Sequence, residues 1–214
     1  MINLGLKRSL VLIIWNAKIL AYWFYEKMNK SPMKNDLDII TERLELRAIK
    51  LDDAEALYRY RSDAITNQYQ GWIPRTLDDA YDFIGNEVAK TIDQYDTWFQ
   101  FAIIKKDNDE LIGDIGVHFL DEEKCQVEIG CTLAKNHHGK GFAREALNAI
   151  IKYLFVDLNK RRIISSIDPR NANSIKMVES LGFRKEAHFK ESILINGEWF
   201  DDVVYALLKD EWSN

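Results

Sequence analysis

One stretch of this chain limits its fold more than any other, a glycine-rich turn between a strand-like run and a helix-like run. The strand-like run covers 126–133, and the turn that follows places Gly139 and Gly141 on either side of Lys140. Glycine lets a backbone approach a ligand closely, and the first turn of a helix offers free N–H groups with a partial positive charge. The turn therefore predicts one of two features, a cradle for an anion such as phosphate or an ordinary tight turn.

The rest of the chain reads as a β-rich middle between helical segments. Apolar and charged residues alternate in the first strand, whereas Leu147, Ile150 and Leu154 recur at helical spacing. These two periods predict two sets of elements. Strands are expected at 41–47, 98–104, 111–120, 125–133, 162–167, 183–195 and 199–208, and helices at 52–61, 77–92, 142–158 and 173–181.

Local signals mark where several of these elements begin and end. Thr76 is a good helix N-cap, and Asp79, three residues later, makes a weak capping box. Gly182 is expected as the residue just past the end of the last helix. The pair Asn196-Gly197 predicts the tight turn of a terminal hairpin.

The lengths of the connections predict strand directions. Short polar turns make the three strands between 98 and 133 antiparallel neighbours. A helical crossover separates 125–133 from 162–167, so these two strands are expected to run parallel.

Composition restricts the function classes. A chain of 214 residues suits one domain, or one domain with an appendage. A hydrophobic content of 47% with 29% charged residues is ordinary for a globular protein. The net charge of −5 argues against a nucleic-acid partner, because a general nucleic-acid binder needs a broad basic face. An acidic surface suits a cationic substrate such as an amine.

The two cysteines, Cys125 and Cys131, indicate a reducing compartment. Six residues apart on one strand, they would lie about 20 Å from each other, whereas a disulfide needs Cα atoms within about 7 Å. We therefore expect two free thiols and a cytoplasmic location. Neither cysteine forms a metal-ligand spacing with the histidines, so no metal is expected.

Residues 1–36 have the composition of an apolar extension. The apolar runs 9–15 and 19–25 are interrupted by Asn16 and Lys18. Each run is too short to span a bilayer, and a lysine at mid-membrane would cost about 2.5–3.5 kcal/mol. Two interpretations stay open, an interfacial aromatic helix that contacts a membrane through 9–25 and an extension outside the core fold.

Several short motifs occur in this order of elements. The turn reads His138-Gly139-Lys140-Gly141-Phe142-Ala143, between Glu128-Ile129-Gly130 and Arg144-Glu145-Ala146. The other motifs are Thr41-Glu42-Arg43-Leu44-Glu45-Leu46-Arg47, Asn171-Ala172-Asn173-Ser174, Leu181-Gly182-Phe183, Trp199-Phe200-Asp201-Asp202 and Tyr205-Ala206-Leu207-Leu208. Together they resemble the Gcn5-related N-acetyltransferase (GNAT) family. The opening and closing motifs resemble its RimJ/RimL-like branch of ribosomal-protein N-terminal acetyltransferases and their relatives.

The resemblance covers about 37–210 and implies a fold. This is the GNAT fold of the α/β (α+β) class, a mixed, mostly antiparallel twisted sheet of about seven strands flanked by helices. It implies a single acetyltransferase domain over 37–214 and leaves open the status of the extension, 1–36. The implied activity moves an acetyl group from acetyl-CoA to a primary amine, foremost a protein N-terminal α-amine. The oligomeric state is not readable from the sequence.

The resemblance also implies which residues bind acetyl-CoA. Main-chain N–H groups of the turn would hold the pyrophosphate. In this fold the strands 125–133 and 162–167 splay apart, so their unpaired backbone groups would bind the pantetheine arm. The expected donor-binding residues are Leu133, Ala134, His138, Gly139, Lys140, Gly141, Phe142, Ala143 and Asn173.

This chain departs from the family pattern at two positions. His138 stands where the motif prefers Arg or Gln, which main-chain binding of phosphate tolerates. Ser180 stands where many relatives carry a tyrosine that acts as general acid. The usual acid is therefore missing from its expected place.

Three residues are candidates for the chemistry. The attacking amine must be neutral, and Glu128 is the first candidate for the base that deprotonates it, directly or through water. The other interpretation of Glu128 is an ordinary strand carboxylate, and Glu191 is a weaker second candidate base. Ser174 fits a serine that polarises the leaving thiolate, or else a helix N-cap.

Tyr69, Trp72 and Pro74 lie in a loop where relatives contact the acceptor. They are candidates for substrate binding, and plain packing is the alternative.

Three other functions were weighed against a protein N-terminal acetyltransferase. The variant His138 and the missing tyrosine are compatible with an acetyl-CoA-binding regulatory module that has little catalysis. A small amine such as a polyamine or an antibiotic is a second alternative acceptor. A P-loop nucleotide enzyme fits poorly, because the turn lacks a Gly-Lys-Ser/Thr sequence.

Overall fold

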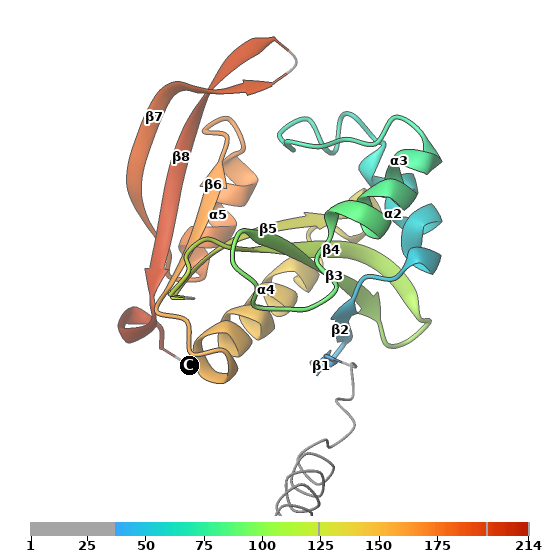
Figure 1. Cartoon of the computed structure of the whole chain (residues 1–214), viewed down its shortest axis with the longest axis horizontal. Coiled ribbons are helices and arrows are strands. Elements are labelled where there is room, and N and C mark those ends of the chain that lie inside the picture. Colours follow the sequence, from blue (N-terminus) through green and yellow to red (C-terminus); the bar gives the residue numbers. More distant parts are fainter. Residues whose placement is uncertain (1–36, 124, 196, 214) are drawn as a thin grey trace, which may run out of the picture. The chain divides into compact units, whose positions relative to one another are not determined.

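An eight-stranded sheet organises the part of the chain that the structure describes. The computed structural model describes residues 37–123, 125–195 and 197–213, and the chain from Asp38 onward forms one compact unit. Figure 1 shows helices on both sides of this sheet. The strands are β1 (Ile39–Ile40), β2 (Leu44–Ala48), β3 (Thr97–Lys105), β4 (Glu110–Phe119), β5 (Gln126–Leu133), β6 (Arg162–Ile167), β7 (Arg184–Ile195) and β8 (Glu198–Leu208).

The sheet has the mixed, mostly antiparallel character predicted from the sequence. The strand order is β1-β2-β3-β4-β5-β6-β8-β7, and β5 and β6 run parallel while the other neighbours run antiparallel. The eighth strand is β1, whose Ile39 and Ile40 pair with Leu46 and Glu45. Two residues are too short for an alternating pattern, which explains why the sequence indicated seven strands.

In the described part of the chain, the sheet is covered by the α-helices α2 (Ala54–Arg61), α3 (Leu77–Asp82), α4 (Phe142–Lys152) and α5 (Ala172–Ser180). In Figure 1, α2 and α3 lie above the sheet and α4 lies below it. Two π-helical turns (Phe83–Glu87 and Tyr153–Asp157) extend α3 and α4, and single 3-10 turns occur at Leu51–Asp53, Lys135–His137 and Lys209–Glu211. No helix among the described residues is long and apolar enough to cross a membrane. The segment 9–25 lies outside the described residues.

The α2 and α3 side is closed by a hydrophobic cluster. Leu57 of α2 and Ile84 after α3 pack against Ala102 and Ile104 of β3. The predicted N-cap of α3 is confirmed, because the Thr76 hydroxyl accepts from the Asp79 N–H at 3.2 Å and the Asp79 carboxylate accepts from the Thr76 N–H at 2.9 Å. The helical segment ends at Glu87, so the prediction that it reaches 92 was wrong.

The other face of the sheet buries the apolar stripe of α4. Leu147, Ile150, Ile151 and Leu154 are buried, as the helical spacing predicted. Phe101 of β3 and Tyr153 pack edge to face, with their ring centroids 6.4 Å apart. Both faces of the central strands are therefore covered, and six consecutive residues of β3, Phe99–Ile104, are buried.

Helix α5 begins and ends through hydrogen bonds that its sequence encodes. The side chain of Asn171 accepts from the Ser174 N–H at 3.1 Å, so Asn171 is the N-cap and the alternative role of Ser174 as cap is wrong. Gly182, at φ 90°, donates to Glu179, and Phe183 donates to Val178. This is a Schellman ending with glycine at the predicted position.

The parallel pair β5 and β6 stays together over a short distance only. Gln126, Val127 and Glu128 pair with Arg162, Ile163 and Ile164, and the pairing stops there. Beyond Glu128 the two strands diverge, which leaves an interruption in the middle of the sheet. The sequence resemblance implied this divergence, and the register confirms it.

The chain ends in a long hairpin whose outer strand is irregular. β7 is an edge strand, and its register against β8 shifts between Phe189 and Ile193. Gly197 has φ 85°, which suits the hairpin turn predicted there, while Asn196 lies outside the described residues. Asp201 of β8 holds the shifted segment through hydrogen bonds from the Lys190 side chain (2.7 Å) and the Glu191 N–H (3.0 Å).

Candidate active site

The turn before α4 has a backbone conformation that glycine adopts easily. Gly139 has φ 72° and Gly141 has φ 82°, both in the left-handed region. A Cβ added at Gly139 would meet no atom within 4 Å, so the space beside the turn is open. The first N–H groups of the 11-residue α4 lack partners within the helix, and this arrangement suits a phosphate group.

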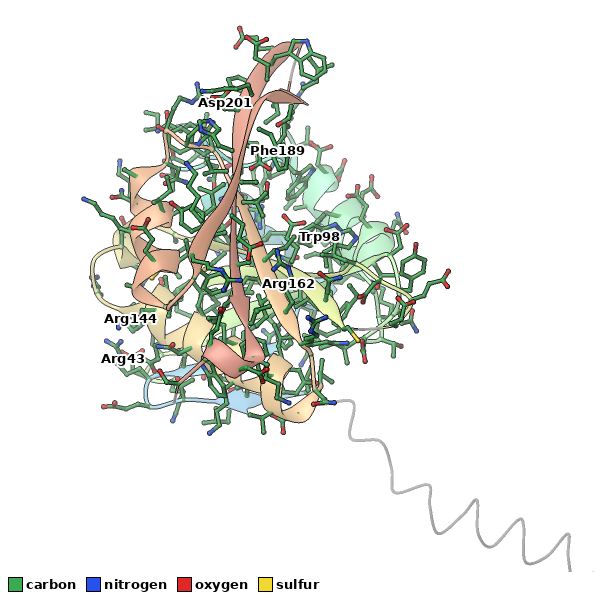
Figure 2. The ribbon with its side chains drawn as sticks, turned by 90° about the vertical axis from the view of Figure 1, so that its left-hand side faces the viewer. Arg43, Trp98, Arg144, Arg162, Phe189 and Asp201 are labelled. Atoms are coloured by element: carbon green, nitrogen blue, oxygen red, sulfur yellow. The ribbon has the colours of Figure 1, made fainter. Side chains whose placement is uncertain are left out.

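The side chains around the two glycines differ in exposure. Lys140 is exposed between them, Phe142 is buried and Ala143 is half-buried. The Phe142 ring faces the guanidinium of Arg43, with the Arg43 Cζ atom 4.4 Å from the ring centroid. Figure 2 shows Arg43 and Arg144 together at one edge of the view, away from Trp98 and Phe189.

The end of β5 uses some of the backbone groups expected to bind pantetheine. The Ala134 N–H donates to Ile112 at 2.8 Å, and the Ala134 carbonyl accepts from the His137 N–H at 2.9 Å. The His138 imidazole Nε2 donates to the Leu133 carbonyl at 2.8 Å. Each carbonyl oxygen keeps a second lone pair for a ligand amide, whereas the Ala134 N–H is already bonded.

Asn173 and Ser174 lie on the first turn of α5, which follows β6. Asn173 is exposed and Ser174 is half-buried. They therefore follow the strand on the far side of the divergence, across from β5.

A row of three side chains crosses the sheet where β5 and β6 begin to diverge. Trp98 of β3 pairs with His118 of β4, and His118 pairs with Glu128 of β5. Directly opposed residues project from the same face of a sheet. The Trp98 and His118 rings stack with centroids 4.7 Å apart, and His118 Nε2 lies 3.4 Å from an Asp96 oxygen.

The carboxyl group of Glu128 has an environment that favours its neutral form. Burial raises the pKa of Glu128; nearby His118 opposes that shift, Asp202 reinforces it, and a hydrogen bond from the Ser166 N–H opposes it. Asp202 is buried on β8 and accepts from the Ser166 hydroxyl at 2.7 Å and the Ile167 N–H at 3.1 Å. A carboxylate with a raised pKa is better suited to accept a proton near neutral pH.

In the next row along the same face, two paired glycines present no side chains. Gly116 and Gly130 are paired on β4 and β5, one step from Glu128. Gly130 is exposed, and an added Cβ would meet no atom within 4 Å. A Cβ at Gly116 would meet Gln100 at 3.0 Å and Trp98 at 3.1 Å. The surface beside Glu128 therefore has room for another molecule at Gly130.

A buried ionic cluster joins α2 to the middle of β4. Asp114 is fully buried, accepts from the Tyr60 hydroxyl at 2.5 Å, and accepts from the side chains of Arg61 and Gln100. Burial alone would lower the pKa of Arg61, but the Asp114 carboxylate more than offsets this and raises it. Removal of one partner from such a pair typically costs about 3–5 kcal/mol. The cluster therefore fixes α2 firmly to the sheet.

Two of the three expected acceptor-binding residues are packed into the protein. Trp72 stacks on Phe83 with ring centroids 4.4 Å apart, and Pro74 is buried. Their positions agree with the packing alternative.

The third residue, Tyr69, is half-buried and lies near a different element. The guanidinium carbon of Arg170, in the loop between β6 and α5, is 5.7 Å from the Tyr69 ring centroid. The same guanidinium lies 4.5 Å from the centroid of Phe200 on β8. Arg170 therefore links the loop after α2 to the terminal hairpin.

Glu191 is not beside Glu128. It is exposed on β7, and β6 and β8 lie between β7 and β5. At about 4.8 Å per strand, three strand spacings amount to about 14 Å. Glu191 belongs to the shifted segment of the hairpin, with φ 45°.

Among the described residues, no group of three His, Cys, Asp or Glu side chains could hold a metal ion. Cys125 and Cys131 are free. Burial raises the pKa of the Cys131 thiol to about 12, so this thiol stays protonated at neutral pH.

The sequence did not predict Trp98, His118, Asp202 or Arg43 as site residues. Trp98 and His118 line up with Glu128 through strand register, which single-sequence patterns do not give. Asp202 raises the Glu128 pKa from β8, two strands away from β5. Arg43 lies in the motif that begins at Thr41, but the sequence alone does not show that it is close to the glycine turn.

The sheet opens between two parallel strands, and a glycine turn lies at the head of the crossover helix, which is the acetyltransferase architecture that the sequence resemblance implied. Residues 43–184 match the family model of the acetyltransferase (GNAT) domain. The chain belongs to the GNAT family and is an N-acetyltransferase of that type.

Relatives and solved structures agree with this membership. The chain is 38% identical to the uncharacterized N-acetyltransferase p20 of Bacillus licheniformis, over 82% of this chain and 98% of the relative. It is 31% identical to the [ribosomal protein uS5]-alanine N-acetyltransferase of Escherichia coli, over 54% of this chain and 60% of that enzyme. A GNAT-family acetyltransferase structure from Bacillus anthracis has a TM-score of 0.73 and 31% identity, covering 82% of this chain and 100% of that one.

Proposed function

We propose that this protein transfers an acetyl group from acetyl-CoA to the α-amine of a protein N-terminus. Glu128 would act as the base, in the manner of the RimJ/RimL-like branch. One observation carries the proposal. The only carboxylate in the row Trp98–His118–Glu128 stands where β5 and β6 begin to diverge, half-buried and with a raised pKa.

The residues of this chain fit the two ends of acetyl-CoA. The left-handed glycines and the open space at Gly139 suit the pyrophosphate. The divergence of β5 from β6 suits an extended arm that carries amides, because such an arm would satisfy the main-chain groups that pairing leaves free. Acetyl-CoA supplies an activated acyl group, which the amine nitrogen attacks at the carbonyl carbon while the thiolate leaves.

The protein side of the reaction is proton handling and orientation. Glu128 accepts a proton from the amine, directly or through water, and His118 at its side limits how far the pKa of that carboxyl is raised. Ser174, on the first turn of α5, would give a hydrogen bond to the departing sulfur. Gly130 leaves room for the amine, since a side chain there would occupy the surface beside Glu128.

The acceptor class follows from the strength of the base. An α-amine has a pKa of about 7.7–8.0 and lysine about 10.4, so an α-amine is far more often neutral at pH 7. A single carboxylate with a raised pKa suits the weaker demand of an α-amine. The likeness to an enzyme that acetylates the alanine of a ribosomal protein supports this choice.

The domain and its location are part of the proposal. We propose that 37–214 carries the whole activity, that 1–36 stays outside the catalytic domain, and that the reaction takes place in the cytoplasm, where the two free thiols suit a reducing environment.

The test measures coenzyme A release by the purified full-length protein. The acceptors are short peptides with free N-termini, the same peptides with blocked N-termini and an internal lysine, spermidine, and an aminoglycoside. We expect turnover with free N-termini and at least about tenfold less with blocked peptides, because the lysine amine is protonated. Faster turnover of spermidine or the aminoglycoside would replace the acceptor, and binding of acetyl-CoA without turnover of any amine would favour a regulatory module.

A further inference from the structure

Two sequence motifs that lie about a hundred residues apart bind each other beside the glycine turn. The first is Thr41 to Arg43, just before β2, and the second is the start of α4 at Glu145. The Glu145 carboxylate accepts from the Thr41 hydroxyl at 2.6 Å, the Arg43 N–H at 2.8 Å and the Arg43 Nε at 2.6 Å. This carboxylate therefore receives three hydrogen bonds from one short segment.

The same arginine reaches the turn itself. Arg43 Nη1 donates to the carbonyl oxygen of Lys140 at 3.0 Å, and its guanidinium lies over the ring of Phe142. An added Cβ at Gly141 would lie 3.4 Å from Arg43 Nη2. Arg43 thus contacts the turn at the residue before Gly141 and at the residue after it.

The pairing neutralises both charges. Burial alone would raise the pKa of Glu145, but the hydrogen bonds from Thr41 and Arg43 hold it below its ordinary value. The Glu145 side chain is 18% exposed and that of Arg43 is 43% exposed. Glu145 also lies in the first turn of α4, where a negative charge would otherwise repel a bound phosphate close to the helix start. Arg43 offsets that charge.

From this geometry we infer that Arg43 and Glu145 form a brace that positions the glycine turn for the diphosphate of the donor. The inference rests on the proposed use of acetyl-CoA. Arg43 holds the Lys140 carbonyl away from the bound phosphate, so that the N–H groups of the turn and not a carbonyl oxygen face the anion. Arg43 is a positioning residue, since its guanidinium hydrogen bonds go to Glu145 and Lys140.

A direct contact between Arg43 and phosphate would predict the opposite result in one variant. If Arg43 bound the phosphate itself, Glu145→Gln would release the guanidinium and tighten donor binding. If Arg43 acts through the turn, Glu145→Gln weakens the brace and loosens donor binding. The sign of this single change distinguishes the two roles.

The experiment compares Arg43→Met, Glu145→Gln and Arg47→Met in the full chain. Arg47 is a matched control, because its guanidinium donates two hydrogen bonds of 2.7 and 2.8 Å to the Asp53 carboxylate. Like the Glu145 carboxylate, the Asp53 carboxylate also accepts a hydrogen bond from a main-chain N–H. Its pair is more buried, with 19% and 10% exposure, so its loss should disturb folding at least as much. The readouts are KM for acetyl-CoA, kcat, the acceptor KM and thermal unfolding.

We expect Arg43→Met to raise KM for acetyl-CoA about 10- to 100-fold, the range for losing charge-assisted hydrogen bonds. The values of kcat and acceptor KM should stay within about twofold, because the row at Glu128 is untouched. Glu145→Gln should raise the same KM by a smaller factor. Arg47→Met should leave it unchanged.

A truncated donor separates the proposed role of Arg43 in diphosphate binding from general damage to the fold. S-acetylpantetheine lacks the diphosphate, so wild type and Arg43→Met should use it with equal kcat/KM. An equal loss with both donors would overturn the inference in favour of a general structural role. A lower KM in Glu145→Gln would overturn it in favour of direct contact. If the wild-type protein fails to bind coenzyme A at all, the proposed function fails first, whatever the variants do.

Discussion

The glycine turn at 138–143 and the row Trp98–His118–Glu128, which we propose as the donor turn and the acceptor row, present different kinds of group to a ligand. The turn uses main-chain groups from one short run, 138–145, whose geometry depends on two glycines. The row uses the side chains of Trp98, His118 and Glu128 from three strands, which meet only because the register of β3, β4 and β5 aligns them. A main-chain site is therefore visible in a local motif, whereas a side-chain site depends on how distant strands pair.

The two regions also differ in how charge is handled. At the turn, Glu145 is matched by Arg43, and its pKa is held low. In the row, burial of Glu128 outweighs the weaker attraction of His118, and its pKa is raised. A fully paired carboxylate supports structure, while a partly desolvated one beside an imidazole can exchange a proton.

The largest expected effect separates chemistry from donor binding. Glu128→Gln should lower kcat by about 10²- to 10⁴-fold, the usual contribution of a general base. The Kd for acetyl-CoA should stay within about twofold, because the turn is untouched. Stopped-flow or steady-state CoA release gives kcat, and calorimetry gives Kd. A variant that keeps kcat would remove Glu128 from the mechanism.

The stability of the same variant is a second check. Burial raises the folded-state pKa of Glu128, so the stability linked to this group is fully present at low pH and is lost as pH rises through that pKa. At pH 8 Glu128→Gln should therefore unfold at the same temperature as wild type or a higher one. A lower unfolding temperature would mean that lost activity reflects damage to the fold.

At Gly141, an added negative charge should weaken acetyl-CoA binding more than backbone strain does. Gly141→Asp should weaken acetyl-CoA binding by about 100-fold or more, because a carboxylate would repel phosphate at a helix start and φ 82° disfavours any side chain. Gly141→Ala carries the strain without the charge and should lose clearly less affinity. Equal losses in the two variants, measured by calorimetry, would place the effect in the backbone alone.

A smaller effect concerns the pH dependence of the acceptor row. The activity should fall as pH decreases through the raised pKa of Glu128, since the protonated acid accepts no proton. His118 lowers that pKa, so His118→Phe, which keeps a ring to stack on Trp98, should move the acidic limb of kcat/KM to higher pH. At pH 6 we expect a loss of about threefold or more relative to wild type. An unmoved limb would show that His118 does not act on Glu128.

The smallest expected effect tests whether both regions lie within the domain. A chain that starts at Met33 should bind acetyl-CoA and turn over peptides within about twofold of the full chain, because the turn and the row both belong to the compact unit after Asp38. A large loss of either property would assign a role to the segment before Met33.

The sequence predicted the local features of this molecule better than the long-range ones. The cap at Thr76, the ending at Gly182 and the glycine turn depend on residues a few positions apart, and the structure has them where they were expected. The extent of the helix that begins at Leu77 was overestimated, because Ile92 continued an apolar spacing that the fold does not use.

The residues of the candidate site show the same difference between local and long-range features. Family motifs indicated the turn and Glu128, but nothing local marks Trp98 or His118 as neighbours of Glu128. Arg43 and Glu145 were both within quoted motifs, and only the tertiary structure shows that they bind each other. The N-cap of α5 is Asn171, three residues before the alternative cap Ser174. The side chain that accepts a hydrogen bond from the helix backbone is therefore that of Asn171 and not that of Ser174.

The early end of the β5 and β6 ladder has a consequence for how the sheet exchanges its amide hydrogens. A sheet with an opening in its centre has two inner edges whose amides are exposed to exchange with water, in a place where most proteins are at their most protected. A ligand that fills this opening completes the sheet as an added strand would. Under the proposed function, acetyl-CoA would be a temporary part of the sheet, and its release at each turnover would expose the two inner edges again.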